Sequence, residues 1–260
     1  MFPFDITNLG ASFQRYFTVV PALGAELRDE AFRIRHQVYC EDLKYEPARP
    51  DGREIDRYDE HSLHCLVRSV KTGQFVGCTR LVKCRPEAPH EPLPFERTCA
   101  ASLDRSVVDP QALPRQRIAE VSRLAVVAGF RNRRGERQSP LPLDKNSFGN
   151  AAQPRFPYIP VALYLATTEL ARLHGIDTLF VLTEPRLAGH FARLGVNIRQ
   201  VGAPVEHRGV RVPSMVKVKE VLDGLNFIMR PLYEVIAEEV RRGLEEQQTL
   251  PTPALALSSN

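Results

Sequence analysis

The sequence has no tryptophan and only three methionines among its 260 residues. No apolar run approaches the roughly 20 residues that a membrane span needs. The N-terminus, MFPFDITNLG, lacks the basic and then apolar segments of a secretory signal peptide. The five cysteines form no CxxC pair and no cysteine–histidine cluster with zinc spacing. No disulfide framework is implied, so we expect a cytoplasmic protein with no transmembrane segment and no metal site.

Several catalytic signatures are also missing. The chain contains no GxSxG, HExxH, P-loop or kinase-like motif, and no GxGxxG follows an expected strand. The seven histidines are scattered, with His61 and His64 flanking an acidic segment. We therefore find no candidate for covalent nucleophilic catalysis and no dinucleotide-binding fold.

The composition is that of a folded protein with a large core, since 43% of the residues are hydrophobic and 25% are charged. The formal net charge of +4 is too small to indicate nucleic acid binding by itself. We expect one domain over residues 1–225 that carries a mobile arginine-rich insertion near 129–157. A helix over 226–250 and a flexible tail over 251–260 would follow.

Hydrophobic periodicity gives the expected order of elements. Strand patterns cover 13–20, a hairpin from SLHCLVRSV to FVGCTRLVK, a central strand over 117–127, TLFVLT and a closing hairpin over 205–218. Amphipathic helices are expected over 23–38, from Tyr158 to Gly175, over 185–195 and over 227–247, with one short helix within 85–116. This order predicts an α/β fold with a mixed β-sheet flanked by helices.

The segment DGREIDRYDE, residues 51–60, contains five acidic residues. Glu54, Asp56 and Asp59 form the pattern ExDxxD, and carboxylates this close repel one another unless a cation lies among them. A metal, a substrate ammonium or a protein arginine would serve, and the missing calcium-loop pattern makes a metal the weaker choice. The alternative is a solvated acidic loop.

Three arginines, Arg35, Arg80 and Arg123, lie inside or beside apolar segments. A guanidinium there keeps its charge and needs carboxylate partners, which the acidic segment would supply either for function or as plain structural ion pairs. Glu120 and Arg123 are three apart and would point to opposite faces of a regular strand. A β-bulge would bring both toward one cleft.

A basic segment lies downstream of the central strand. Between Arg105 and Arg137 the chain has eight arginines and three acidic residues, most densely in RNRRGER (131–137). Arginine binds phosphate or carboxylate in a bidentate manner, whereas aromatic residues suited to base stacking are missing apart from Phe130. We therefore favour an acidic protein or a phosphate group over nucleic acid as the partner, with a solvated charged loop as the alternative.

Together these motifs resemble the acyl-homoserine-lactone (autoinducer) synthases and N-acyl amino acid synthases of the Gcn5-related acetyltransferase (GNAT) superfamily. That family's pattern is an arginine, two spaced aromatic residues, ExDxxD, a strand arginine and ExxR. Here the matching residues are Arg35, Tyr39, Tyr45, Glu54, Asp56, Asp59, Arg80, Glu120 and Arg123. The terminal helix RPLYEVIAEEVR and the overall length look most like acyltransferases of the PEP-CTERM/exosortase protein-sorting system.

The resemblance implies a GNAT-like fold and an N-acyltransferase that moves a fatty acyl group to an amine by direct attack. Tyr45 stands where autoinducer synthases have tryptophan, and the stretch from Arg80 to Glu120 is longer. Both departures favour an amino acid or another amine over S-adenosylmethionine as acceptor. The arginine-rich insertion replaces the glycine-rich pyrophosphate loop, which favours acyl carrier protein over coenzyme A as bearer of the acyl-phosphopantetheine thioester.

The resemblance also implies the site residues, with no tightly bound cofactor. Glu120 would be the base, with Arg80 and Arg123 beside it in the catalytic site. The acceptor would be bound by Arg35, Tyr39, Tyr45, Glu54, Asp56 and Asp59. Acyl carrier protein would dock on Arg131, Arg133, Arg134 and Arg137. The alternatives are an acyl-homoserine-lactone synthase that uses S-adenosylmethionine, a non-catalytic module that binds the acyl carrier, and a plain CoA-dependent acetyltransferase.

Overall fold

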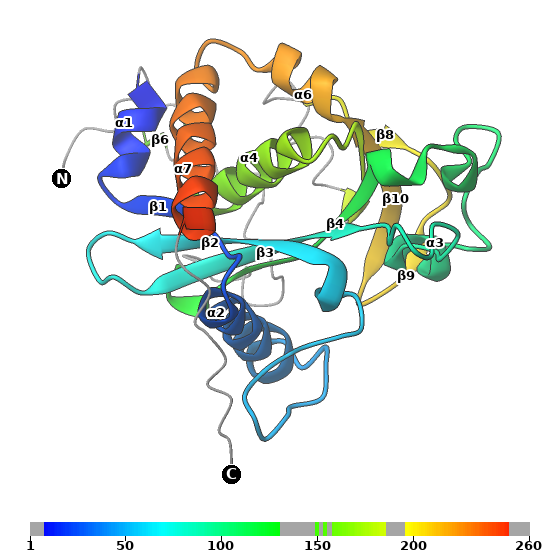
Figure 1. Cartoon of the computed structure of the whole chain (residues 1–260), viewed down its shortest axis with the longest axis horizontal. Helices are drawn as coiled ribbons and strands as arrows, with labels where there is room; N and C mark the ends of the chain where they lie inside the picture. Colours follow the sequence, from blue (N-terminus) through cyan, green and yellow to red (C-terminus); the bar gives the residue numbers. More distant parts are fainter. Residues whose placement is uncertain (1–7, 131–148, 151–152, 155–157, 186–195, 250–260) are drawn as a thin grey trace.

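A computed structural model describes residues 8–130, 149–150, 153–154, 158–185 and 196–249. In these residues eight strands form one mixed sheet in the order β1-β2-β3-β4-β7-β10-β8, with β9 paired to β10 (Figure 1). The strands are β1 (Phe17–Pro21), β2 (Ser62–Ser69), β3 (Phe75–Lys83), β4 (Ile118–Val126), β7 (Thr178–Thr183), β8 (Arg199–Gln200), β9 (Val205–Glu206) and β10 (Val210–Lys217). A separate short ladder joins β5 (Gly149–Asn150) and β6 (Gln153–Pro154).

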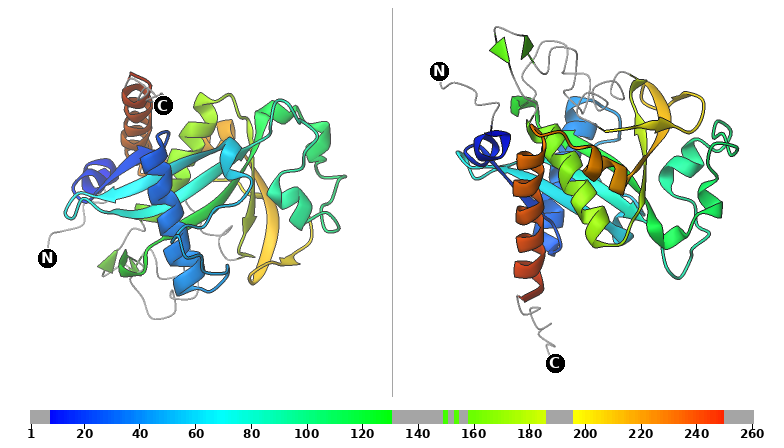
Figure 2. Two further views of the ribbon diagram at one scale, coloured as in Figure 1. Left: turned by 60° about the horizontal axis from the view of Figure 1, so that its bottom comes forward. Right: turned by 90° about the horizontal axis from the view of Figure 1, so that it is seen from above.

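Helices cover both faces of the sheet, as Figure 2 shows. They are α1 (Leu9–Gln14), α2 (Ala25–Arg35), α3 (Pro94–Thr98), α4 (Tyr158–Leu173), α6 (Val218–Gly224) and α7 (Arg230–Thr249). Side chains alternate along each strand, so Cys65 and Val67 of β2 pack with α4 and α7, while Leu66 packs with α2 on the opposite face. The expected α/β fold with a mixed sheet is thus confirmed.

Most of the expected elements are present. The hairpin is β2 and β3, the central strand is β4, and TLFVLT is β7. The closing hairpin is β9 and β10. The helix expected over 185–195 lies outside the described residues.

Several boundaries were wrong. Residues 13–14 belong to helix α1, because the Asn8 side chain caps it through Ala11 N–H (3.0 Å) and Phe13 is buried in the core. After Arg35, α2 continues as a π-helix over His36–Asp42. Helix α7 begins at Arg230, because the side chain of Asn226 accepts from the Ile228 and Met229 N–H groups in a turn before it.

The outer strand β1 is held on its free side by helix α7. The carboxylate of Glu239, which lies on the helix, accepts a hydrogen bond from Val19 N–H at 2.7 Å. Gln247 accepts from Leu23 N–H (3.0 Å) and donates to Pro21 C=O (2.7 Å). The approach is close, since a Cβ on Gly243 would lie 2.7 Å from the Pro21 ring. No helix in the described part of the chain is long and apolar enough to cross a membrane.

The junction between β4 and β7 opens a space within the sheet. Strands β4 and β7 are parallel neighbours in the sheet. They pair from Ile118 opposite Thr178 to Val121 opposite Val181. Strand β4 then continues to Val126 beside β3. The two strands therefore separate beyond Val121.

Candidate active site

A cavity of about 340 Å³ lies where β4 and β7 separate. One wall is β4 from Glu120 to Leu124, and the opposite wall is formed by Val181 and Leu182 of β7. Four tyrosines line it, together with residues of the β9–β10 hairpin: Tyr39, Tyr45, Tyr58, Tyr164, His207, Arg208 and Arg211. The cavity is thus polar and aromatic, and it opens at the centre of the sheet.

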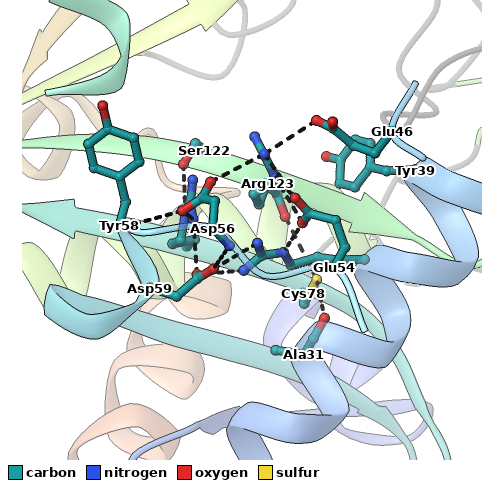
Figure 3. Close-up of polar contacts among 12 residues, drawn as sticks. Ala31, Tyr39, Glu46, Glu54, Asp56, Tyr58, Asp59, Cys78, Ser122 and Arg123 are labelled. Atoms are coloured by element: carbon teal, nitrogen blue, oxygen red, sulfur yellow. Dashed lines mark hydrogen bonds and ion pairs between the residues drawn. The ribbon is translucent and has the colours of Figure 1, made fainter. Parts of the chain in front are cut away.

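Next to this cavity the acidic segment pairs with the three arginines. Figure 3 shows Glu54, Asp56 and Asp59 of that segment gathered near Arg123. Arg35 is fully buried and binds Asp59 through two parallel hydrogen bonds of 2.6 and 3.0 Å. Its Nε also donates to Glu54 at 2.5 Å. The Glu54 N–H donates to Phe32 C=O, which ties the acidic segment to α2. Bidentate pairing of this kind fixes both position and direction of the groups.

Arg80, on β3, is almost completely buried. Its Nη1 donates to Asp56 (2.7 Å) and to Asp59 (2.9 Å), and its Nε donates to Ser122 Oγ (3.1 Å). Because Asp59 also binds Arg35, one carboxylate joins two guanidinium groups.

Arg123 reaches the same cluster through a bulge in β4. Between the Cys78–Ala125 and Arg80–Ser122 pairs, Arg123 and Leu124 of β4 lie opposite the single residue Thr79 of β3. The φ angle of Arg123 is +51°, a left-handed conformation that is costly for a side-chain-bearing residue. Its guanidinium binds Glu54 (3.0 Å) and Asp56 (3.3 Å). The strand is therefore bulged at Arg123, and both Glu120 and Arg123 line the cavity.

The cations among the clustered carboxylates are therefore protein arginines. In the segments that the structure describes, no group of three or more metal-ligating side chains could hold a metal ion. Burial opposes ionisation of Glu54, but Arg35 and Arg123 outweigh it and lower the pKa of Glu54 to about 2. The same balance, with Arg35 and Arg80, holds the pKa of Asp59 well below its usual range. Glu54 and Asp59 therefore stay ionised at neutral pH.

Glu120 is different. It is buried, and its Oε2 accepts a hydrogen bond of 2.6 Å from the backbone N–H of Phe95 in α3. Burial raises the pKa of Glu120 to about 8, although Phe95 N–H, Arg80 and Arg123 oppose the shift. A carboxyl group with this pKa exchanges a proton near neutral pH, as a general base must.

The predicted residues fall into three groups. Lining the cavity are Tyr39, Tyr45, Asp56, Arg80, Glu120 and Arg123. Lying below it and outside its lining are Arg35, Glu54 and Asp59. The predicted docking residues Arg131, Arg133, Arg134 and Arg137 lie outside the described residues.

Tyr39 packs between the cavity and the cluster. Its hydroxyl donates to Leu124 C=O (2.9 Å), and the Arg123 guanidinium lies 5.7 Å from its ring centre. Burial raises the pKa of Tyr39 well above its usual range, so the hydroxyl stays protonated. Tyr39 thus supports the bulged part of β4.

Some lining residues were missed by the sequence interpretation. Tyr58 lies within the acidic segment, and Ser122 lies between the two predicted β4 residues, so proximity in sequence was an available signal. Arg208 adopts a φ of +53° in the β9–β10 turn and pairs with Glu46, which also contacts Arg123 at 3.5 Å. No sequence pattern pointed to Phe95, because it acts through its backbone N–H.

A second, apolar cavity of about 50 Å³ lies between helix α4 and strands β4, β7 and β10. It shares Val121, Tyr164 and Val181 with the polar cavity. The rest of its lining is almost entirely aliphatic, with Val161, Leu165, Leu179, Val216, Val221, Leu225 and Met229. A ligand at the β4–β7 junction would thus have polar surroundings at one end and apolar surroundings at the other.

Known proteins resemble this chain in sequence and in fold. Residues 34–139 match the acetyltransferase (GNAT) domain family. An acyl-homoserine-lactone synthase of Rhizobium radiobacter is 25% identical over 173 residues, which cover 66% of this chain and 69% of that one.

Among the solved structures of similar fold are the following two. One is BjaI, a CoA-dependent acyl-homoserine lactone synthase, with a TM-score of 0.54 and 20% identity over 88% of this chain and 99% of that one. The other is FeeM, an N-acyl amino acid synthase from uncultured soil microbes, with a TM-score of 0.51 and 15% identity over 80% and 94%.

The fold is GNAT-like, and the match of residues 34–139 to the GNAT domain family supports an acyltransferase. The chain is similar in sequence to an acyl-homoserine-lactone synthase and similar in fold to an N-acyl amino acid synthase.

The buried cluster gives a stability prediction. Replacing Glu54 by Gln leaves Arg35 and Arg123 short of a counter-charge, so the free energy of unfolding at pH 7 should fall by about 3–5 kcal/mol. Because the folded-state pKa of Glu54 is lowered, the wild-type advantage is present above the unfolded value near 4.5 and is lost as the pH falls toward 2.

Urea denaturation of both proteins between pH 2 and 7 measures this difference. Asp223→Asn is the matched control, because its ion pair with Lys219 is exposed. A Glu54→Gln difference that is small at pH 7, or that does not shrink in acid, contradicts the prediction.

Proposed function

We propose that this chain is an N-acyltransferase that moves a fatty acyl group from an acyl carrier protein thioester to an amino acid or a related amine. The observation that carries the proposal is the shared wall of the two cavities at the β4–β7 junction. The polar cavity suits an amine, the aliphatic lining of the smaller cavity suits the first carbons of an acyl chain, and the reacting carbonyl would lie between them. Glu120 precedes Val121 of this shared wall and lines the polar side.

The reaction is direct aminolysis. The acceptor ammonium gives a proton to the Glu120 carboxylate, directly or through a water molecule, and becomes a neutral amine. The amine nitrogen attacks the thioester carbonyl carbon, which forms the C–N bond. As the C–S bond breaks, the positively charged nitrogen loses a proton and the leaving thiolate takes one up. The products are an amide and a free thiol, and Glu120 returns its proton to solvent.

Polar groups of the cavity orient the acceptor in this proposal. Asp56 and Arg123 both line the cavity and remain partly exposed. Asp56 can therefore accept a hydrogen bond from a substrate ammonium, and Arg123 can donate to a substrate carboxylate. Arg35, Glu54 and Asp59 lie beneath and fix the two cavity arginines through the hydrogen bonds described above. Their role is to position the groups that touch the acceptor.

The carbonyl oxygen requires a hydrogen-bond donor as negative charge develops on it. We propose a backbone N–H of β4 beyond Val121, where the recorded pairing with β7 ends. No acyl-enzyme and no tightly bound cofactor enter this scheme.

For the donor we propose acyl-phosphopantetheine on acyl carrier protein rather than acyl-CoA. The support is the arginine-rich segment that contains Arg131, Arg133, Arg134 and Arg137, which would contact an acidic carrier. CoA remains the alternative, since BjaI is described as CoA-dependent. The association with the PEP-CTERM/exosortase system stays a prediction.

The second candidate is an acyl-homoserine-lactone synthase that uses S-adenosylmethionine, which the Rhizobium radiobacter relative favours. Mass spectrometry of reactions with acyl carrier protein or CoA thioesters, amino acids and S-adenosylmethionine separates the candidates. An N-acyl amino acid supports our proposal, whereas 5′-methylthioadenosine with an acyl lactone supports the second. Carrier binding without any acylated amine would indicate a non-catalytic module and overturn both.

Glu120→Gln should reduce the acyl transfer rate by about 10²–10⁴-fold while the fold is kept. In the wild type, the rate should rise about tenfold per pH unit below 8 and level off above it, because Glu120 acts when ionised. Rates measured from pH 6 to 9.5 test both points, with Glu238→Gln on the exposed face of α7 as control. Full activity of Glu120→Gln would show that another group is the base.

The docking proposal predicts a salt-dependent effect. Reversing the charges of Arg133 and Arg134 to Glu should raise the KM for acyl carrier protein about tenfold at low salt and change kcat little. The effect should fade as salt screens the charges. Arg242→Glu, on α7, is the control. Normal carrier affinity of the double variant at low salt would refute docking at these residues.

A further inference from the structure

The connection between β3 and β4, residues 84–117, forms part of the cavity wall. It contains α3 and two short 3₁₀ turns, Pro110–Ala112 and Arg115–Arg117. Pro94, Arg97 and Thr98 of α3 line the polar cavity. This segment therefore belongs to the site.

A buried ion pair holds the connection together. The side chains of Arg115 and Glu96 are only 6% and 5% exposed. Their hydrogen bonds measure 2.7 Å (Nη2 to Oε2) and 3.2 Å (Nη1 to Oε1). The same guanidinium donates to the backbone carbonyls of Pro89 (2.9 Å), Glu91 (3.0 Å) and Pro110 (3.1 Å). One arginine thus joins both ends of the connection.

Glu96 connects the Arg115 guanidinium to the start of α3. Its Oε2 accepts from Leu93 N–H at 2.8 Å, and its Oε1 accepts from the Gln111 side chain at 2.6 Å. The orientation of the first turn of α3 is therefore tied to the Arg115 guanidinium. A buried charge that loses its partner is strongly destabilised, so this arrangement resists small shifts.

The first turn of α3 contacts the proposed base. Phe95 N–H donates to Glu120 Oε2 at 2.6 Å. Among the described residues, this is the hydrogen bond that the Glu120 carboxyl group accepts. The fully buried Phe95 ring stacks on Phe180 of β7, with ring centres 4.4 Å apart and planes 13° apart. The stack fixes the ring, while Glu96 fixes the backbone beside it.

From this geometry we infer that Glu96 and Arg115 are positioning residues, which hold α3 so that Phe95 N–H fixes one oxygen of Glu120 and directs the carboxyl group toward the cavity. The inference rests on the proposed role of Glu120 as base. It assigns a function to a buried pair that touches no substrate.

The pair should also tune the proton affinity of Glu120. The charged and titratable groups that face Glu120 are Arg80, Arg123, Asp56 and the Cys99 thiol that follows α3. The Phe95 hydrogen bond favours the ionised carboxylate and so lowers the pKa of Glu120 against the effect of burial. Loss of that bond should raise the pKa further and leave less ionised base at neutral pH.

Two variants test the inference. Glu96→Gln removes the charge but keeps an oxygen for Leu93 N–H. The double variant Glu96→Met/Arg115→Met removes both charges, so it can fold even where the single change does not. Arg105→Ala is the matched control, because its pair with Asp109 lies in the same connection but is exposed.

The first measurement does not depend on activity. The carboxyl C=O band of Glu120 is followed by infrared difference spectroscopy from pH 5 to 10, with Glu120→Gln as the reference that identifies the band. The titration midpoint should rise by about one pH unit in the two pair variants and stay unchanged in Arg105→Ala. Thermal unfolding confirms that each variant is folded.

The second measurement is the pH profile of acyl transfer. In the pair variants its rise should shift to higher pH by the same amount, with kcat at pH 7 about tenfold lower and KM unchanged, because a tenfold loss of ionised base accompanies one pH unit. A folded pair variant with the wild-type infrared midpoint overturns the inference. A fully active Glu120→Gln instead overturns the role of Glu120 as base, while the infrared titration still decides whether the pair positions that side chain.

Discussion

The candidate site depends on the pairing of three buried or nearly buried guanidinium groups with three carboxylates from one short segment. Removing these charges from water is costly, and each guanidinium repays the cost only through several short hydrogen bonds in fixed directions. Arg35 anchors Glu54 and Asp59, and these in turn hold Arg123 and Arg80. The cluster thus joins α2, β3 and β4, and it keeps β4 in a bulged conformation directly above it.

The bulge and the β4–β7 separation act together. The bulge turns Arg123 into the cluster while Glu120 stays at the cavity, and the separation opens space on the side of β4 that faces β7. Burial raises the pKa of Glu120. Burial acts in the same direction on Glu54, but there the ion pairs with Arg35 and Arg123 outweigh it and the pKa is lowered. Glu54 and Glu120 therefore differ widely in proton affinity although they lie close together, a pattern typical of proton-transfer chemistry.

Much of this was predictable from the sequence. The strand and helix patterns predicted the mixed sheet. The need of arginines in apolar segments for carboxylate partners, together with the family resemblance, predicted that Arg35, Arg80 and Arg123 meet the ExDxxD segment. The N-terminal boundary failed because the capped turn at Asn8 outweighs the β-propensity of FQRYF. The division between cavity-lining and supporting residues was not predictable, because burial depends on which strands pair. Phe95 carries no signal at all, since any residue but proline offers the same backbone N–H.

The contact between helix α7 and strand β1 has a consequence for assembly. An outer strand normally presents free N–H and C=O groups, which allow another chain to extend the sheet. Here Glu239 and Gln247 already occupy the groups at Val19, Pro21 and Leu23. Extending the sheet at this edge would require the helix to leave first and would expose the buried Glu239 carboxyl group. Helix α7 therefore acts as a built-in substitute for a neighbouring strand and protects this edge from aggregation.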